Sequence, residues 1–256
     1  MRAVIFNSGM GSRMGGLTRL QPKCMTALYN GETIFARQVR ILSACGVREF
    51  VVTTGPFAQQ IEAAATACRR CSPGIDFIFV PNPLYQTTNY IVSMYLARDY
   101  LDTNLLLLHG DLVFDEGLVQ EMLANPARSL CLYHEDKILP RKDFKAQFCN
   151  GMLKKVSVRI FDEDCYAFQP LYKLDIDAVR IWRDQVTMFV EAGKDQVYAE
   201  EALNEVASDM KIAGMSYKLH YIDEIDNEQD YCRVSEEIRR FDEALDGPGK
   251  TDCRLM

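Results

Sequence analysis

The chain has 256 residues, of which 48% are hydrophobic and 25% charged, as in an ordinary globular protein. Its net charge of −7 argues against a nucleic-acid partner, because binding to nucleic acid requires a basic surface. No apolar run approaches the ~18 residues of a membrane span, and the start lacks a signal-peptide pattern. We therefore expect a cytoplasmic protein with no nucleic-acid or membrane partner; a monomer and a homodimer both remain open.

Strand and helix patterns alternate through the first half of the chain. Short apolar runs predict strands at residues 3–6, 49–54, 75–80 and 104–109. Helical spacing of apolar residues predicts helices at 33–45, 57–70 and from 88 or 89 to about 101. This order predicts an α/β fold, a three-layer, doubly wound, Rossmann-like and mostly parallel mixed sheet.

The second half is less regular. The same patterns predict strands at 129–135, 144–149, 153–160, 165–172 and 217–222, and helices at 175–192, 198–208 and 227–245. Asn150-Gly151 is a favourable two-residue turn between two of these strands. We therefore predict a single domain at residues 1–245 with an inserted hairpin at about 136–160, and a frayed tail at 246–256.

The nine cysteines do not indicate a disulfide framework, because their number is odd and they are scattered through apolar segments. Cys68 and Cys71 form the only Cys-x-x-Cys pair. A zinc site would require a second pair at ligand spacing, so a structural role is the better interpretation of these thiols.

A glycine-rich loop follows the first predicted strand. Gly9 and Gly11 lie in it, and Arg13 and Lys23 come after them. Glycine lets backbone N–H groups approach a phosphate closely, and the two cations supply charge where a triphosphate is negative. A dinucleotide-binding fingerprint would require a third glycine where the chain has Met14. The loop therefore indicates chemistry on a nucleotide phosphate.

Other predicted strands end in glycine or aspartate at positions equivalent to the loop. Gly55 follows the second strand, and Gly110-Asp111 follows the four leucines of the fourth. Ligands of open α/β sheets bind at this edge, so we expect one shared site. The carboxylate of Asp111 is suited to a magnesium ion that bridges phosphate oxygens. The alternative is that Asp111 caps a helix that begins near Asp115.

The spacing Gly-x-Gly-x-Arg, followed by Leu-Thr-x3-Pro-Lys, resembles the N-terminal motif of the sugar-1-phosphate nucleotidyltransferase superfamily. Its members more often have Ala-Ala-Gly where this chain has Asn7-Ser8-Gly9. Within that superfamily, further segments resemble bacterial CTP:phosphocholine cytidylyltransferases. These segments are residues 82–85, 89, 93, 108–114, 165–169, 198–202 and 221–226, with 230–231.

The resemblance implies a magnesium-dependent transfer of CMP from CTP to a small phosphorylated alcohol or phosphonate, with release of pyrophosphate. It implies catalytic roles for Lys23 and Arg13 and magnesium ligation by Asp111 and Asp226. The implied nucleotide-binding residues are Asn7, Ser8, Gly9, Gly11, Ser12, Arg13, Lys23, Gly55, Tyr85, Asn89, Ser93 and Gly110. The implied acceptor-binding residues are Tyr172, Trp182, Tyr198 and Glu200.

Several alternatives remain open from the sequence alone. Asn89 can simply cap a helix, Ser93 can be solvated, and aromatic residues at helix or strand spacing are often part of the core. The acceptor could be phosphocholine, aminoethylphosphonate, another alcohol phosphate or a sugar phosphate. A sugar-1-phosphate nucleotidyltransferase that uses UTP or dTTP is the nearest rival function. A non-catalytic nucleotide sensor is the alternative from another class.

Overall fold

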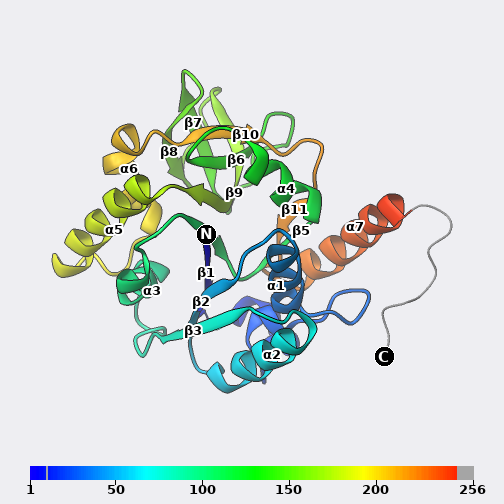
Figure 1. Cartoon of the computed structure of the whole chain (residues 1–256). Coiled ribbons are helices and arrows are strands. Elements are labelled where there is room, and N and C mark those ends of the chain that lie inside the picture. The colour runs from blue at the N-terminus through cyan, green and yellow to red at the C-terminus, as the bar shows by residue number, and fades with distance from the viewer. Residues whose placement is uncertain (10, 247–256) are drawn as a thin grey trace.

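Most strands of the protein belong to one mixed sheet in the computed structural model, which describes residues 1–9 and 11–246 (Figure 1). The strands are β1 (Arg2–Asn7), β2 (Glu49–Thr54), β3 (Asp76–Pro81), β4 (Leu105–His109), β5 (Leu112–Phe114), β6 (Leu130–His134), β7 (Lys145–Cys149), β8 (Met152–Ser157), β9 (Cys165–Leu174), β10 (Ala213–Ser216) and β11 (Ile222–Glu224). Nine of them run in the order β3-β2-β1-β4-β9-β6-β10-β8-β7, and β11 pairs with β5 separately.

The first four strands of the sheet confirm the predicted parallel half. β1 pairs in parallel with β2 and with β4, and β2 pairs in parallel with β3. Continuous apolar runs such as the four leucines of β4 are fully buried because helices cover both faces. The carboxyl ends of β1, β2 and β4 therefore meet at one edge, as a doubly wound sheet requires.

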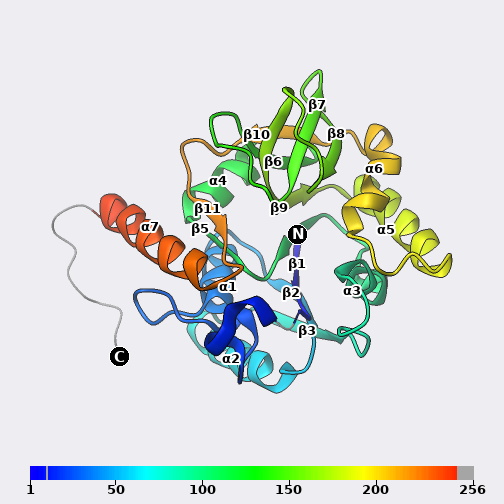
Figure 2. The same cartoon turned by 180° about the vertical axis from the view of Figure 1, so that it is seen from behind.

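Within the described residues, seven α-helices and three short 3-10 helices surround the sheet (Figures 1 and 2). They are α1 (Ile34–Ala44), α2 (Ala58–Cys71), α3 (Tyr90–Leu96), α4 (Glu116–Ala124), α5 (Ile176–Glu191), α6 (Ala199–Met210), α7 (Glu228–Asp246), η1 (Ser12–Thr18), η2 (Lys23–Met25) and η3 (Arg98–Tyr100). One hydrophobic core contains residues of α1, α2 and α4, and a second, on the other face, contains residues of α3, α5 and α6. None of the described helices combines the length and apolarity needed to cross a bilayer.

A third, smaller core fixes the glycine-rich loop. Met14 of η1 is fully buried against Val113, Ile225 and Val234, which belong to β5, the segment after β11, and α7. Burial of a methionine side chain contributes roughly 1.5–3 kcal/mol. Met14, which stands where a dinucleotide fingerprint would have glycine, therefore ties the loop to the last helix.

The second half of the sheet is antiparallel around β9. As predicted, this strand returns to the main sheet, and it pairs with β4 and with β6. The hairpin β7–β8 lies inside the predicted insertion, and Asn150 (φ 51) and Gly151 (φ 76) form its turn. β7 also pairs with β9, so this half of the sheet curls back on itself.

Some boundary predictions are wrong. The predicted strand at 217–222 is instead a turn between β10 and β11, in which the N–H of His220 donates to the Tyr217 carbonyl. Tyr217 and Ile222 are both buried, and only Ile222 belongs to a strand, as the first residue of β11. The helix expected to reach about residue 101 ends at Leu96, and η3 follows. The predicted frayed tail lies, except for Asp246, outside the described residues.

Candidate active site

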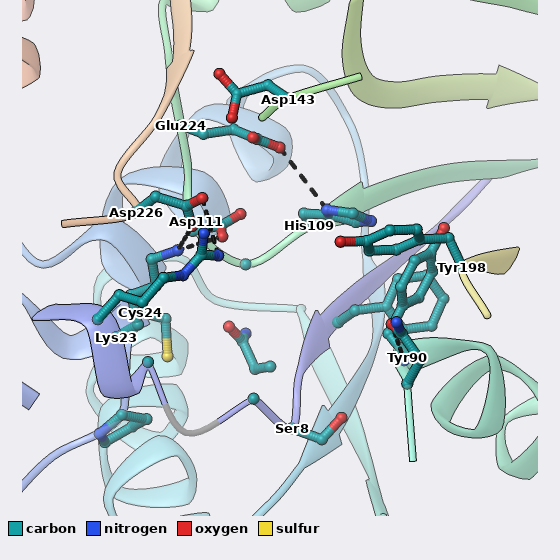
Figure 3. Close-up of a pocket in the computed structure, with 18 of the residues that line it drawn as sticks. Ser8, Lys23, Cys24, Tyr90, His109, Asp111, Asp143, Tyr198, Glu224 and Asp226 are labelled. Carbon is teal, nitrogen blue, oxygen red and sulfur yellow. Dashed lines mark hydrogen bonds and ion pairs between the residues drawn. The ribbon is translucent and has the colours of Figure 1, made fainter. Parts of the chain in front are cut away.

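A cavity of about 340 Å³ opens at the carboxyl ends of β1 and β4. The glycine-rich loop and η2 line one side, and the segments before β7 and after β11 line another. Figure 3 shows Lys23 beside Asp111 and Asp226, with His109, Tyr90 and Tyr198 on the other side of the cavity. The predicted phosphate loop and the predicted metal ligands therefore share one site.

Lys23 lies between two carboxylates. Its Nζ is 2.6 Å from Asp111 Oδ2 and 2.5 Å from Asp226 Oδ1, and Arg13 lies 3.0 Å from the other oxygen of Asp226. Burial by itself would lower the pKa of Lys23, but the two carboxylates outweigh it and raise the pKa to about 12. The ammonium group therefore remains charged at neutral pH and points into the cavity.

Two further carboxylates complete an acidic group around this lysine. Glu224, two residues before Asp226, can share a metal ion either with His109 and Asp111 or with Asp143 and Asp226.

Burial, together with the charges of Asp111 and Asp226, raises the pKa of Glu224 well above its usual range. Burial also acts to raise the pKa of Asp111, but Lys23 and His109 outweigh it and hold that pKa below its usual value. The site therefore combines an ionised and a more readily protonated carboxyl group.

Some polar atoms at the floor of the cavity are buried without a hydrogen-bond partner among the described residues. They are Asn7 Nδ2, His109 Nε2 and Asp111 Oδ1, and all three residues line the cavity. A buried donor or acceptor without a partner costs about 1–3 kcal/mol. The cost is avoided when a ligand supplies the partner, so these atoms are suited to bind one.

The backbone at this floor has room for glycine only. A Cβ atom at Gly110 would lie 1.6 Å from Asn7 Oδ1, and one at Gly11 (φ +62) would lie 3.1 Å from Lys23 Cβ. Both glycines therefore let a side chain of the site approach the backbone, Asn7 at Gly110 and Lys23 at Gly11.

We expect Gly110→Ala to lower the free energy of unfolding by about 1–3 kcal/mol through overpacking. The substitution would also displace the Asn7 amide from the cavity floor. Gly16→Ala is the matched control, because a Cβ atom added at Gly16 would have no other atom within 4 Å. Urea unfolding of the two variants measures the difference; equal stabilities would show that the floor can relax.

Aromatic rings form the wall opposite Lys23. The rings of Tyr90 and His109 have centroids 4.7 Å apart, and those of Phe144 and Tyr198 are 5.1 Å apart. Phe6 packs against Tyr90 at 5.3 Å. Glu224 Oε1 lies 3.8 Å from His109 Nδ1, so a carboxylate borders this wall. Aromatic faces beside carboxylates are suited to an organic cation.

The predicted nucleotide-binding residues separate into two groups. Those that line the cavity are Asn7, Ser8, Gly9, Gly11, Arg13, Lys23, Asn89 and Gly110. Asn89 also caps α3, since its side chain accepts from Tyr90 N. The capping alternative is therefore correct for Asn89, and its contact with a nucleotide stays a prediction. Ser12 begins η1, but its side chain lies outside the described part of the chain.

Ser93, Gly55 and Tyr85 lie away from this cavity. Ser93 is buried, and its hydroxyl lies 2.6 Å from Ser8 Oγ, behind the loop. Gly55 also lies behind Ser8, where a Cβ would come within 2.3 Å of the Ser8 carbonyl oxygen. Tyr85 lines a second, more open pocket beside Gly15 and Gly16. For Ser93 and Gly55, the structure indicates that they support the loop.

Of the predicted acceptor-binding residues, only Tyr198 lines the cavity. Tyr172 and Trp182 are fully buried in the core, where the Trp182 indole donates to the Ala199 carbonyl. Glu200 is buried behind the cavity wall and accepts hydrogen bonds from the hydroxyl groups of Tyr90 and Tyr172. The core alternative is therefore correct for Tyr172 and Trp182, and Glu200 supports Tyr90.

Glu200 also provides a test by pH. Burial raises the pKa of this carboxyl group in the folded protein. When the pKa of a carboxyl group is higher in the folded than in the unfolded protein, protonation of that group stabilises the fold. This stabilisation is fully present below the pKa of the unfolded state and is lost as the pH rises through the pKa of the folded state. As the pH rises above the ordinary glutamate pKa of about 4, we therefore expect Glu200→Gln to gain stability relative to the wild type. Urea unfolding across this range measures the difference; a constant difference would contradict the assignment.

The sequence interpretation missed several residues of the cavity. His109 and Glu224 lay inside segments that carried the resemblance, and each is two residues before a predicted metal ligand. That proximity was a usable signal. Lys142, Asp143 and Phe144 come from the loop before β7, which lies far from the glycine-rich loop in the sequence, and the pairing of β7 with β9 places this loop beside the cavity.

Comparison with curated proteins finds relatives named as a CMP-phosphonate synthase and as cytidylyltransferases. The chain is 33% identical to CMP-5′-(3-aminopropyl)phosphonate synthase of Streptomyces rubellomurinus over 129 residues. These residues make up 50% of this chain and 20% of the relative. It is 26% identical to CTP:phosphoglutamine cytidylyltransferase of Campylobacter jejuni over 48% of each chain. It is 24% identical to 2-aminoethylphosphonate cytidylyltransferase of Lancefieldella rimae over 88% of each. The matched region thus spans less than half of the first two relatives.

Solved structures share the fold at low sequence identity. The CTP:phosphocholine cytidylyltransferase of Streptococcus pneumoniae matches with a TM-score of 0.73 and 17% identity, over 93% of this chain and 98% of that one. The inositol-1-phosphate CTP transferase of T. maritima matches with a TM-score of 0.72 and 17% identity, over 93% and 96%. These likenesses confirm the predicted nucleotidyltransferase fold.

The family described as the MobA-like NTP transferase domain matches residues 3–157. This region contains the glycine-rich loop, Lys23 and Asp111, which meet in the cavity. Since the match covers more than half of the chain, the protein belongs to the MobA-like NTP transferase family.

Proposed function

We propose that this protein transfers a cytidylyl group from CTP to a phosphate or phosphonate oxygen of a small amine-bearing acceptor, with release of pyrophosphate. The observation that carries the proposal is the position of Lys23. Its ammonium group lies between Asp111 and Asp226, beside the glycine-rich loop and across the cavity from the aromatic wall. A cation in this position can contact a triphosphate held by the loop and an acceptor that lies between it and the wall.

The reaction needs charge neutralisation more than it needs a base. A phosphate or phosphonate oxygen that attacks the α-phosphorus is already anionic at neutral pH, so no proton has to be removed from it. Lys23 would donate to the α-phosphate, and Arg13, which is largely exposed, would reach the β- and γ-phosphates. Both cations would exchange a carboxylate oxygen for a phosphate oxygen as the nucleotide binds.

The acidic group fits a magnesium ion. Asp111 Oδ1 has no hydrogen-bond partner among the described residues, and Asp226, Glu224 and Asp143 offer oxygens within 4.8 Å of one another. Hard oxygen ligands of this kind suit Mg²⁺. We propose that Asp111 and Asp226 hold the ion, with Glu224 as the nearest further ligand. When bound, magnesium would neutralise charge on the phosphate oxygens.

The aromatic wall supports an acceptor with a positively charged amine. Tyr198, Phe144 and His109 face the cavity beside Glu224 and Asp143. Cation–π contacts contribute about 0.5–2 kcal/mol, more when the cation is desolvated. The names of the three curated relatives include an aminoalkylphosphonate or phosphoglutamine, each of which carries an amine. 2-Aminoethylphosphonate is therefore the first acceptor to test, together with phosphocholine, the acceptor that the sequence resemblance implies.

A panel of substrates tests the proposal. Purified protein with Mg²⁺ would be given CTP, UTP, dTTP or ATP, together with phosphocholine, 2-aminoethylphosphonate, phosphoglutamine or glucose 1-phosphate. We expect pyrophosphate release to be fastest with CTP and an amine-bearing acceptor. Preferential turnover of UTP or dTTP with glucose 1-phosphate would favour the sugar-1-phosphate function. Tight CTP binding without pyrophosphate release would favour a nucleotide sensor.

A further inference from the structure

One buried lysine lies just behind the cavity and contacts no phosphate-loop residue. Lys145, the first residue of β7, is fully buried (0% exposed). Its Nζ donates to three backbone carbonyls, those of Pro140 and Asp143 at 3.0 Å and of Val158 at 2.6 Å. The ammonium group also lies 4.0 Å from the centre of the Phe161 ring. All three of its protons are therefore used within the protein.

These contacts join two chain segments that both reach the cavity. Pro140 and Asp143 belong to the loop between β6 and β7, and Val158 follows β8. Lys142, Asp143, Phe144 and Val158 line the cavity. The lysine therefore connects, through backbone atoms, the two segments that form the wall beside Glu224 and Tyr198.

Burial of this charge requires a reason. A buried ammonium without a hydrogen-bonded carboxylate loses its hydration, and three carbonyl dipoles and one aromatic face replace it only in part. A hydrophobic residue would fill the same space in a core at lower cost. What the ammonium adds is a single point at which three carbonyl groups converge, which fixes the loop conformation.

We propose that Lys145 is a positioning residue that holds residues 140–144 against the end of β8. Asp143 and Phe144 are thereby kept in the cavity wall beside Glu224 and Tyr198, where the acceptor is proposed to bind. This role rests on the proposed function in one respect only, namely that the molecule in contact with this wall is the acceptor. Because the wall lies on the acceptor side, the lysine should affect acceptor binding and leave CTP binding nearly unchanged.

The chain contains a matched control. Lys173 on β9 is also buried, and its Nζ donates to the carbonyls of Met122 and Asn125 at 2.9 and 2.8 Å, at the end of α4. None of these three residues lines the cavity. If both buried lysines served only the stability of the fold, Lys145→Met and Lys173→Met would have the same effect on hydrogen exchange of residues 140–144 and on the KM of the acceptor.

The first experiment is amide hydrogen exchange, which does not depend on any activity. We expect peptides covering residues 140–144 to exchange faster in Lys145→Met than in the wild type, and to be unchanged in Lys173→Met. Equal exchange of these peptides in wild type and Lys145→Met would overturn the positioning role. If Lys145→Met does not fold, Lys145→Arg replaces it, because a planar guanidinium cannot direct three donors from one nitrogen.

The second experiment separates the two substrates kinetically. For Lys145→Met, we expect the KM of the amine-bearing acceptor to rise about 10- to 100-fold, the scale of a small misplacement in a site. The KM of CTP should change by less than about twofold. An acceptor KM that changes no more than in Lys173→Met, or a parallel rise in the KM of CTP, would overturn the inference. A wild type that turns over no acceptor would refute the proposed function alone, and hydrogen exchange would still decide the positioning role.

Discussion

Replacing Lys23 with alanine should lower kcat for pyrophosphate release roughly 100- to 1000-fold while the protein remains folded. The loss corresponds to about 2.7–4 kcal/mol of transition-state stabilisation, the range found when one preorganised donor to a developing charge is removed. Lys23 is the group that the structure places between both carboxylates, and its raised pKa keeps it charged. Steady-state kinetics and a thermal melt, both with Mg²⁺ present, measure the two quantities.

The same substitution has a second consequence in the free protein. Without the ammonium group, Asp111 and Asp226 face each other, with Arg13 as the only remaining cation paired to Asp226 among the described residues. We therefore expect Lys23→Ala to be less stable without magnesium than with it. Lys194→Ala is the matched control, because Lys194 is exposed and lies over the Phe189 ring, outside the cavity. A near-normal kcat in Lys23→Ala would refute the assigned role.

Asp111→Asn should raise the concentration of magnesium needed for half-maximal activity and lower kcat roughly 100-fold. The substitution keeps the size of the side chain but removes the charge that both the ion and Lys23 require. Loss of a group that only orients a metal ligand already costs about 10- to 100-fold, and Asp111 is proposed to be a ligand itself. A magnesium titration of the initial rate measures both effects.

Asp226→Asn and Asp164→Asn complete this experiment. Asp226→Asn should raise the magnesium requirement in the same direction, since Asp226 shares Lys23 with Asp111. Asp164 belongs to a separate acidic group with Asp162 and Cys165, so Asp164→Asn should leave the magnesium curve unchanged. If the initial rate of Asp226→Asn depends on the magnesium concentration as that of the wild type does, Asp226 is not a metal ligand. Glu224 or Asp143 would then be the second ligand.

The fold was predictable where local patterns and tertiary packing agree. The short apolar runs that became β1, β2 and β4 are typical of buried parallel strands, and their lengths and the turn residues after them favoured strands over helices. Prediction failed at β10, because Ala213 and Gly214 have low β propensity, and a strand forms there only because β6 supplies the partner. The same limit explains β5, a short strand fixed by its pairing with β11.

The candidate site was predictable on the side of the glycine-rich loop and less so on the side proposed to bind the acceptor. Lys23 and Asp111 follow strands that end at the same edge of the sheet, and their motif spacing was visible in the sequence. Tyr172 and Trp182 had the composition of an aromatic cage, but sequence spacing could not distinguish cage from core. Asp143 and Phe144 reach the cavity through a loop held by Lys145, and such long-range contacts leave no local pattern.

A crystal structure with Mg²⁺ and a non-hydrolysable CTP analogue tests the central claim most directly. We predict that Lys23 Nζ will lie within hydrogen-bond distance of an α-phosphate oxygen, having given up at least one of its two carboxylate partners. Asp111 and Asp226 should then contact the metal ion. An analogue bound elsewhere, with Lys23 still held by both carboxylates, would contradict this account.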